Sequence, residues 1–326
     1  MPTAREQEAL QRHGHIQELE RVDAVWPWLA ERHGTITAVD APHAAHAERF
    51  SFAELAQRIA TAAAAFQRQG VQEGDVVALF AENSPRWLVA DQGLMRCGAA
   101  DAVRGASAPV EELRYILDDC NATALVVQNA DLWRRLDLTA SQRQGLRLVL
   151  QLEGEPEQGV LGWEAFLASG AGQQSVTPTS GRTAIATVLY TSGTTGTPKG
   201  ALLTQSALAS NAVNSAHAHD LTPQDRILTF LPLFHVGGLN IQTLPALMTG
   251  ASVLLHRAFD PGEWLKDVER WQPTWSLFVP ATLNAVASHP QFEKTELSSL
   301  KGLMAGSSTI PEAATRPFFE RGIPVG

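Results

Sequence analysis

The residues best suited to chemistry lie in the segment TSGTTGTPKG at 191–200, directly after the apolar run AIATVLY. The segment holds five hydroxyl side chains, three glycines and one lysine. Glycines let successive backbone N–H groups turn toward one anion, hydroxyls add donors, and a lysine supplies positive charge. The segment therefore predicts a phosphate-binding loop. A flexible linker is the alternative, but linkers do not usually follow a buried strand and end in a single Pro-Lys pair.

This loop differs from the Walker A phosphate loop. Counting from Gly193, a Walker A loop would need Gly-Lys followed by Ser or Thr at 198–200, where this chain has Pro-Lys-Gly. The proline also prevents a helix from beginning there. The run ALLT at 201–204 is typical of a short strand, and the next helix is expected only after Thr204. The sequence therefore predicts a hairpin that joins two strands.

The surrounding pattern predicts the elements that position this loop. From about residue 50 onward, short strand-like runs alternate with helical runs, which is typical of a mostly parallel α/β sheet. Ser51 and Glu54 predict a capping box for a helix that ends at Gly70, and Ser84-Pro85 predicts the start of another. Strands are expected at 75–80, 124–128, 146–152, 185–190, 227–231, 252–255, 275–279 and 302–304. The segment 154–182 is expected to be a surface excursion between two sheet units.

A series of motifs resembles the adenylate-forming (AMP-binding) superfamily, which includes acyl- and aryl-CoA synthetases, nonribosomal-peptide adenylation domains and beetle luciferases. The motifs, in the order that the family has them, are FSFAELAQRI, GVQEGDVVAL, YTSGTTGTPKGALLTQ, LPLFHVGG, VPATL and LMAGSSTIPE. The run ADAVRGASAPVEELRYIL is similar in particular to bacterial long-chain acyl-CoA synthetases. The resemblance covers nearly everything from about residue 20 to Gly326, and it implies two stacked, mostly parallel sheets with flanking helices.

The activity that the resemblance implies is a two-step ligation. A carboxylate attacks the α-phosphate of ATP to give an acyl-adenylate and pyrophosphate, and the thiol of coenzyme A then displaces AMP. Since AMP leaves far more readily than oxide, the adenylate is an effective acyl donor. Negative charge grows on the departing pyrophosphate, so the donors of the loop and Mg²⁺ would stabilise the transition state.

The resemblance also implies roles for individual residues. Phosphate binding is expected of Thr191, Ser192, Gly193, Thr194, Thr195, Gly196 and Lys199, catalysis of His235, Lys199 and Thr191, adenine stacking of Gly306, Ser307 and Ser308, and an acyl pocket of Val236, Gly237, Asn240, Val279 and Pro280. His235 would orient or gate the reacting groups and would not bind a metal. Relatives usually have alanine and proline in place of Ser307 and Ser308, which leaves the shape of that turn open. The absence of aspartate between Ile227 and Arg257 favours a neutral acid over an amino acid.

The domain expectations follow the same resemblance. Residues 1–20 are expected to be an N-terminal extension, and residues 21–326 a partial N-terminal adenylate-forming domain. One sheet unit is expected over about 50–220 and a second over about 221–326 together with 21–49. In relatives, a glutamate that holds Mg²⁺, a ribose-binding aspartate and a small mobile domain with an adenylation lysine follow the position of Gly326. No metal ligand is therefore expected within this chain, and the 326 residues alone are expected to turn over negligibly.

Composition limits the remaining choices. With 25 Lys and Arg against 34 Asp and Glu, the net charge is −9, the wrong sign for general nucleic-acid binding. The chain has no signal-peptide pattern and no run of 18 apolar residues, so a cytoplasmic protein without a transmembrane segment is expected. The leading hypothesis is an acyl-CoA synthetase for a fatty or aryl acid that uses ATP, Mg²⁺ and coenzyme A. The alternatives are a ligase that transfers to an acyl-carrier protein and a non-catalytic nucleotide- or acyl-binding remnant, and a homodimer is left open.

Overall fold

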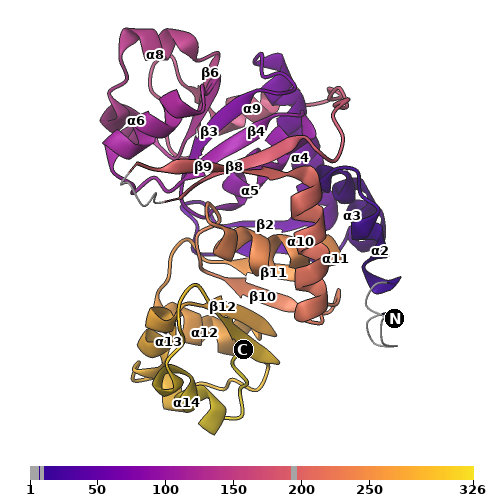
Figure 1. The fold of residues 1–326 in the computed structure, drawn as a ribbon, viewed down its shortest axis with the longest axis vertical. Helices are drawn as coiled ribbons and strands as arrows, with labels where there is room; N and C mark the ends of the chain where they lie inside the picture. The colour runs from indigo at the N-terminus through magenta and orange to yellow at the C-terminus, as the bar shows by residue number, and fades with distance from the viewer. Residues whose placement is uncertain (1–6, 8–10, 192–196) are drawn as a thin grey trace.

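The structure is a computed structural model that describes Gln7, residues 11–191 and residues 197–326 (Figure 1). Its strands form a seven-stranded sheet, in the order β7-β6-β5-β3-β4-β8-β9, and a six-stranded sheet, in the order β13-β12-β10-β11-β1-β2. Neighbouring strands run parallel except in the pairs β8–β9 and β1–β2. The prediction of two mostly parallel sheets with flanking helices is confirmed.

The strands of the two sheets come from interleaved parts of the chain. The seven-stranded sheet contains β3 (Val76–Phe80), β4 (Ala100–Arg104), β5 (Ala124–Val127), β6 (Leu148–Gln151), β7 (Leu161–Gly162), β8 (Ile185–Thr191) and β9 (Lys199–Thr204). The six-stranded sheet contains β1 (Thr37–Ala41), β2 (Glu48–Ser51), β10 (Arg226–Thr229), β11 (Ser252–Leu255), β12 (Trp275–Phe278) and β13 (Gly302–Ala305).

A layer of helices lies between the two sheets (Figure 1). Its members are α4 (Phe52–Arg68), α5 (Pro85–Arg96), α10 (Gln205–Ala218), the π-helix η2 (Gly237–Thr243) and α11 (Leu244–Thr249). Val77 and Leu79 of one sheet and Val253 and Leu255 of the other belong to a single hydrophobic core with residues of these helices. The helices therefore join the two sheets into one body.

The outer faces of the sheets carry the remaining large helices. Because side chains alternate along a strand, Ala78 and Phe80 face away from the shared core and pack with α6 (Val110–Asp119) and α7 (Ala130–Leu136). Leu228 and Leu254 likewise face α12 (Pro261–Trp271), α13 (Pro280–Ala287) and α14 (Glu312–Glu320). The other helical segments are α2 (Gly14–Gln17), η1 (Val22–Ala24), α3 (Val25–His33), α8 (Ala140–Gly145), α9 (Trp163–Gly170) and η3 (Phe292–Lys294).

The local signals read from the sequence are confirmed at the helix ends. The Oγ of Ser51 accepts from the backbone N–H of Glu54 at 3.3 Å, and the Glu54 carboxylate accepts from the N–H of Ser51 at 2.8 Å. The Oγ of Ser84 accepts from the N–H of Trp87 at 3.0 Å at the start of α5. Helix α10 begins directly after Thr204, as predicted.

One expectation about a surface segment differs from the structure. Within 154–182, β7 extends the seven-stranded sheet and α9 packs on α4, so only the flanks of this segment are surface loops. Gly170 explains how closely these helices meet, since a Cβ at this position would lie 2.2 Å from the carbonyl oxygen of Thr61. In the predicted N-terminal extension, Ile16 is fully buried in the shared core and His15 Nε2 lies 3.0 Å from the carbonyl oxygen of Met248.

Candidate active site

The loops that carry the predicted site residues leave the carboxyl ends of parallel strands. In an open α/β sheet, ligands bind at this edge because the loops there diverge and leave a crevice. Thr191 ends β8 in the seven-stranded sheet, and His235 lies in the loop that follows β10 in the six-stranded sheet. Residues 306–308 follow β13 on the same edge as the His235 loop. The fold therefore places residues from both sheets where a ligand site is expected.

The predicted phosphate loop closes a β-hairpin. β8 and β9 pair antiparallel, with Thr191 directly opposite Lys199. The hairpin predicted from the proline is confirmed, and both end residues are exposed. By strand alternation, Lys199 projects from the same face of β9 as Ala201 and Leu203. Ser192, Gly193, Thr194, Thr195 and Gly196 lie outside the described residues.

A cavity of about 340 Å³ joins the hairpin to the histidine loop. Its lining includes Thr191 and Leu189 from β8, Ala201 and Leu203 from β9, and the segment 234–236 from the other sheet. Thr191, His235 and Val236 are thus brought together. Among the described residues, Lys199, Asn240, Val279, Pro280 and the turn Gly306–Ser308 are not part of this lining.

His235 is exposed, and one of its ring nitrogens is engaged. Its Nδ1 accepts a hydrogen bond from the backbone N–H of Gly237 at 3.1 Å, which assigns the proton of the neutral ring to Nε2. The ring therefore keeps an Nε2–H donor available for a ligand. An oriented donor that is open to a cavity suits the predicted role of positioning a carboxylate or phosphate oxygen.

Arg104 and Phe234 are among the residues of the cavity wall that were not predicted as site residues from the sequence. Arg104 ends β4, and its Nε donates to Glu112 Oε1 at 2.8 Å, which fixes a guanidinium in the wall. Phe234 packs so closely on the loop after β4 that a Cβ at Gly105 would lie 2.6 Å from its Cζ. Arg104 lies in the run ADAVRGASAPVEELRYIL, but β4 was not predicted, so no signal marked this arginine as a wall residue.

Of the predicted acyl-pocket residues, Gly237 lines a second and much tighter space. A cavity of about 10 Å³ lies between β10, β12 and η2, and its wall includes Gly237 and Gly238. Gln242 also lines it, is 2% exposed, and has no hydrogen-bond partner for its side-chain amide among the described residues. Asn240 is buried on the α10 side, where its carbonyl accepts from Asn211 Nδ2 at 2.6 Å. Val279 and Pro280 form the start of α13 directly after β12.

The predicted adenine turn has an unusual backbone. Ser307 has φ = +70°, in the left-handed region that favours glycine. Gly306 donates its N–H to the carbonyl oxygen of Phe278 at 3.1 Å, and a Cβ on Gly306 would meet nothing within 4 Å. The turn therefore has a sharp conformation and open space beside its glycine.

The histidine loop is held by Asn83, which follows β3. The side-chain Nδ2 of Asn83 donates to the carbonyl oxygens of Leu231 at 3.0 Å and His256 at 3.1 Å, and its Oδ1 accepts from the N–H of Leu233 at 2.7 Å. Asn83 is 2% exposed, so water does not compete for these bonds. Its side chain thus ties the seven-stranded sheet to the segment that leads into His235.

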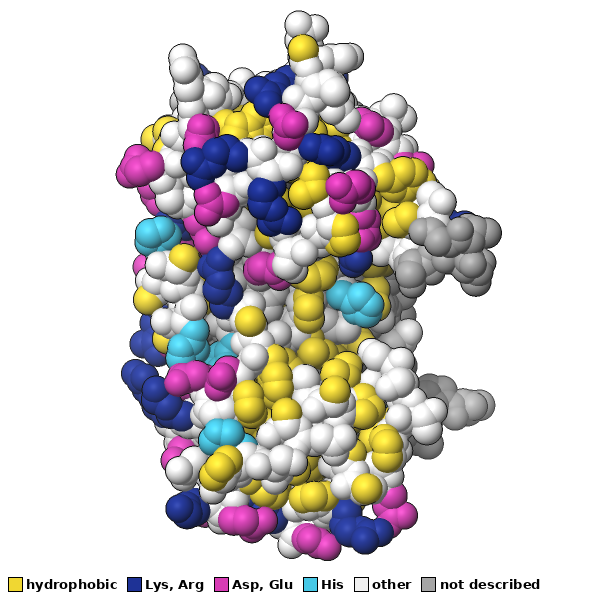
Figure 2. Space-filling view, turned by 90° about the vertical axis from the view of Figure 1, so that its left-hand side faces the viewer, with side chains coloured by type: hydrophobic (Ala, Val, Ile, Leu, Met, Phe, Trp, Pro, Cys, Tyr) yellow, Lys and Arg dark blue, Asp and Glu magenta, His cyan; other side chains and the backbone are white. Residues whose placement is uncertain are grey.

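Charge and apolar surface are distributed unevenly around the molecule. On the face in Figure 2, charged side chains gather at the upper part and the lower end, with hydrophobic ones between them. Val236, at the cavity, is 39% exposed, which is unusual for a large hydrophobic residue.

Burial raises the pKa of Tyr190 in the cavity wall, and its hydrogen bond to Asp119 at 2.7 Å raises the pKa further. Tyr190 therefore stays neutral near pH 7.

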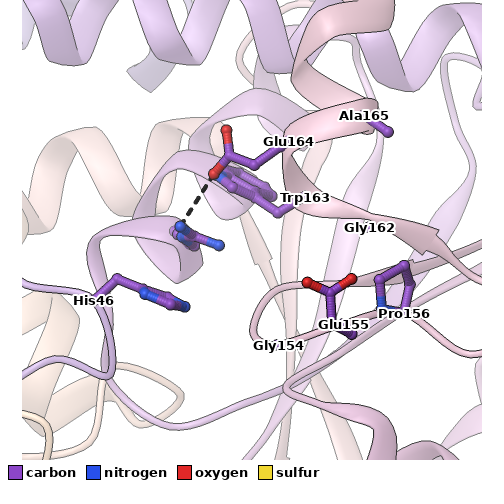
Figure 3. A pocket seen from close by; sticks show the side chains of 9 residues that line it. His46, Gly154, Glu155, Pro156, Gly162, Trp163, Glu164 and Ala165 are labelled. Atoms are coloured by element: carbon purple, nitrogen blue, oxygen red, sulfur yellow. Dashed lines mark hydrogen bonds and ion pairs between the residues drawn. The ribbon is translucent and has the colours of Figure 1, made fainter.

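Another cavity, of about 490 Å³, contains none of the predicted site residues (Figure 3). His46, Glu155 and Trp163 point into it, and Arg86 Nη2 donates to Glu164 Oε1 at 3.1 Å on its wall. Its lining comes from the β1–β2 turn, α5 and the 154–165 segment. It is therefore separate from the edge where the predicted residues meet.

No helix in the described part of the chain is both long and apolar enough to cross a membrane.

The chain is 38% identical over 275 residues to an indoleacetate–CoA ligase of Aromatoleum aromaticum and 33% identical over 276 residues to a feruloyl-CoA synthase of Amycolatopsis sp. These alignments cover 84% of this chain but 53% and 52% of the relatives, so the chain spans about half the length of the curated relatives it matches.

Among solved structures, the anthranilate CoA ligase AuaEII in complex with anthranoyl-AMP superposes with a TM-score of 0.83 at 22% identity. The superposition covers 94% of this chain and 58% of that chain, and it shows the same fold. The family model described as AMP-binding enzyme matches residues 26–325. Nearly the whole chain, including the hairpin and the histidine loop that meet at the cavity, thus matches one family model, and the chain belongs to the AMP-binding, adenylate-forming enzyme family.

Proposed function

We propose that the protein containing this chain activates a carboxylic acid with ATP to an acyl-adenylate and transfers the acyl group to coenzyme A. The observation that carries the proposal is the cavity in which Thr191, at the neck of the phosphate loop, meets His235 of the other sheet. A reaction between a carboxylate and an α-phosphate needs the two groups side by side, and a site built from both sheets supplies such a meeting place.

An aryl acid is favoured over a long alkyl acid. The two curated relatives described above, which are two among several, are named for indoleacetate and ferulate, and both acids carry aromatic rings. The space between β10, β12 and η2 is only about 10 Å³ and must widen for any acyl group to enter it. Gly237, Val236, Asn240, Val279 and Pro280 are proposed as residues around the acyl group.

The phosphate loop would act on the leaving pyrophosphate. Thr191, Lys199 and the loop between them would offer hydroxyl, amide and ammonium donors to the charge that develops there. Removing one well-placed donor of this kind typically costs about 3 kcal/mol of transition-state stabilisation. Arg104 would add a fixed positive charge in the wall. Gly306, Ser307 and Ser308 are proposed to contact the adenine.

The family implies Mg²⁺ as a cofactor. Among the described residues that line the cavity, none carries a carboxylate. Magnesium is commonly bound through one or two carboxylates together with substrate phosphates. The described residues of the cavity therefore do not form a Mg²⁺ site on their own.

The test is acid-dependent ATP–pyrophosphate exchange by the product of the complete gene, with a panel of aryl acids and straight-chain fatty acids. Exchange that is greatest with aryl acids is expected, followed by thioester formation when coenzyme A is added. Lys199→Ala should lower the exchange rate about 100-fold or more. Lys294→Ala removes an exposed lysine of η3 and should leave the rate unchanged.

Each alternative has its own outcome in the same experiment. Thioester formation on an acyl-carrier protein, and none on coenzyme A, would replace the proposed acceptor. ATP binding by calorimetry without exchange for any acid would overturn the proposed reaction and favour a non-catalytic nucleotide-binding protein. A cytoplasmic location stays a prediction from the sequence.

A further inference from the structure

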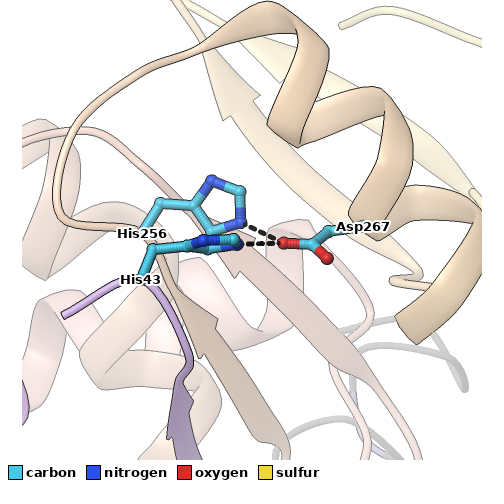
Figure 4. A group of neighbouring side chains, drawn as sticks. All are labelled: His43, His256 and Asp267. Atoms are coloured by element: carbon cyan, nitrogen blue, oxygen red, sulfur yellow. Dashed lines mark hydrogen bonds and ion pairs between the residues drawn. The ribbon is translucent and has the colours of Figure 1, made fainter. Parts of the chain in front are cut away.

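Two histidines and an aspartate from three separate segments converge away from the candidate active site (Figure 4). His43 lies in the turn between β1 and β2, His256 follows β11 directly, and Asp267 lies on α12. The Nε2 atoms of His43 and His256 lie 2.6 and 2.9 Å from the same oxygen, Oδ2 of Asp267. All three potential ligand atoms lie within 4.8 Å of one another.

A fourth oxygen borders this group. Glu263 lies four residues before Asp267, so both carboxylates project from one face of α12. Glu263 Oε2 is 3.7 Å from His43 Nε2. Asp267 and His256 are each 2% exposed, whereas His43 and Glu263 are partly open to solvent. The group thus has a buried inner half and an accessible outer half, which gives an ion a path of entry.

The donor set and its spacing suit a zinc ion. Zinc in proteins takes imidazole nitrogen and carboxylate oxygen as ligands, usually four in a tetrahedron. With bonds of about 2.0–2.2 Å, tetrahedral geometry holds ligand atoms roughly 3.3–3.5 Å apart. The separations of 2.6 and 2.9 Å are shorter than this range, and the separation of 3.7 Å is longer. To make room for the ion, the partly exposed His43 would move away from Asp267, and the buried His256 and Asp267 would separate slightly.

Metal binding also requires a consistent set of protons. Without an ion, both imidazoles donate Nε2–H to Asp267 Oδ2, so each neutral ring has its lone pair at Nδ1. Binding at Nε2 requires the other tautomer of each ring, with the proton at Nδ1. No net proton loss is needed from the neutral rings, and the carboxylates contribute the negative charge that balances the ion.

We propose that His43, His256 and Asp267, completed by Glu263, form a structural Zn²⁺ site. The ion would fasten the β1–β2 turn and α12 to the carboxyl end of β11. The backbone carbonyl of His256 also accepts a hydrogen bond from the side-chain Nδ2 of Asn83, so the site adjoins the contact that holds the histidine loop. The zinc site is separate from the proposed nucleotide site, and it takes no part in the ligation reaction.

The experiment measures zinc binding by the tag-free chain after chelator treatment and dialysis. Competition with a chromophoric chelator should reveal one tight site per chain, and Zn²⁺ should raise the thermal midpoint. His43→Gln should weaken this site at least about 100-fold and abolish the thermal shift. The matched control is His46→Gln, which changes a histidine of the same turn that is outside the cluster and should bind zinc like the parent.

Cobalt supplies a second readout that does not depend on a variant. Co²⁺ in place of Zn²⁺ should give the intense visible absorption of a tetrahedral ion, and His43→Gln should remove it. The proposal is overturned if the folded parent chain binds no Zn²⁺ tightly. It is equally overturned if His43→Gln and His46→Gln bind zinc with the same affinity while circular dichroism shows both to be folded.

Discussion

Asn83 offers the sharpest test of how the two sheets are held together. Replacement of Asn83 with alanine removes three hydrogen bonds, two to carbonyl oxygens and one from a backbone N–H. A typical hydrogen bond contributes about 1 kcal/mol net, so the expected loss in unfolding free energy is about 3 kcal/mol. Because Asn83 is 2% exposed, water cannot easily satisfy the groups left behind, and the loss should not be smaller.

The assay is equilibrium unfolding in guanidinium chloride, followed by the fluorescence of the eight tryptophans. Asn129→Ala is the matched control, since the Asn129 side chain caps α7 through one bond from Leu132 N–H at 3.0 Å. This control variant should lower the unfolding free energy by about 1 kcal/mol. If Asn83→Ala lowers the unfolding free energy no more than Asn129→Ala does, the three hydrogen bonds of Asn83 do not hold the two sheets together as proposed. Asn83→Ala should also increase protease cleavage in the 231–235 segment.

Two further predictions concern backbone packing and buried charge. Gly238→Ala should lower the unfolding free energy by about 1–3 kcal/mol, because the added Cβ would lie 2.0 Å from the carbonyl oxygen of Pro232. The control is Gly145→Ala, whose Cβ would meet nothing within 4 Å and which should not lower the thermal midpoint. Burial, and then the charge of Asp91, raise the pKa of Asp101 well above its usual range. The folded state therefore loses stability as pH rises above the ordinary aspartate pKa of about 3.9, and Asp101→Asn should be the more stable form at pH 7 by about 1–3 kcal/mol. Thermal midpoints measured from pH 3.5 to 8 should show that the difference between Asp101→Asn and the parent becomes smaller as the pH falls. A difference that does not change with pH would contradict the raised pKa of Asp101.

Local patterns were sufficient where neighbours in sequence decide the structure. The Ser51–Glu54 capping box, the Ser84 cap and the strand pair around the phosphate loop all depend on residues within a few positions of one another. Their hydrogen bonds close without help from distant parts of the chain. For the same reason, the proline at 198 was enough to predict a hairpin in place of a helix.

Strands with mixed composition escaped prediction. β1 (TAVDA) and β4 (ADAVR) each contain an aspartate, and β4 also ends in an arginine, so neither reads as a buried apolar run. They become strands because their neighbours on both sides supply hydrogen bonds and a packing surface. As a consequence, the sequence did not place Arg104 in the cavity wall.

The sequence by itself determined the fold class, the hairpin and the order of motifs that identifies the family, since each rests on short-range patterns along the chain. Tertiary structure alone decided which of those motifs meet. It joined Thr191 to His235 across two sheets, placed Asn83 under the histidine loop, and brought His43, His256 and Asp267 together. These contacts span tens to hundreds of residues. The first two form only when both sheets pack on the shared helical layer, and the third forms when β1 and β11 pair within the six-stranded sheet and α12 packs on its outer face.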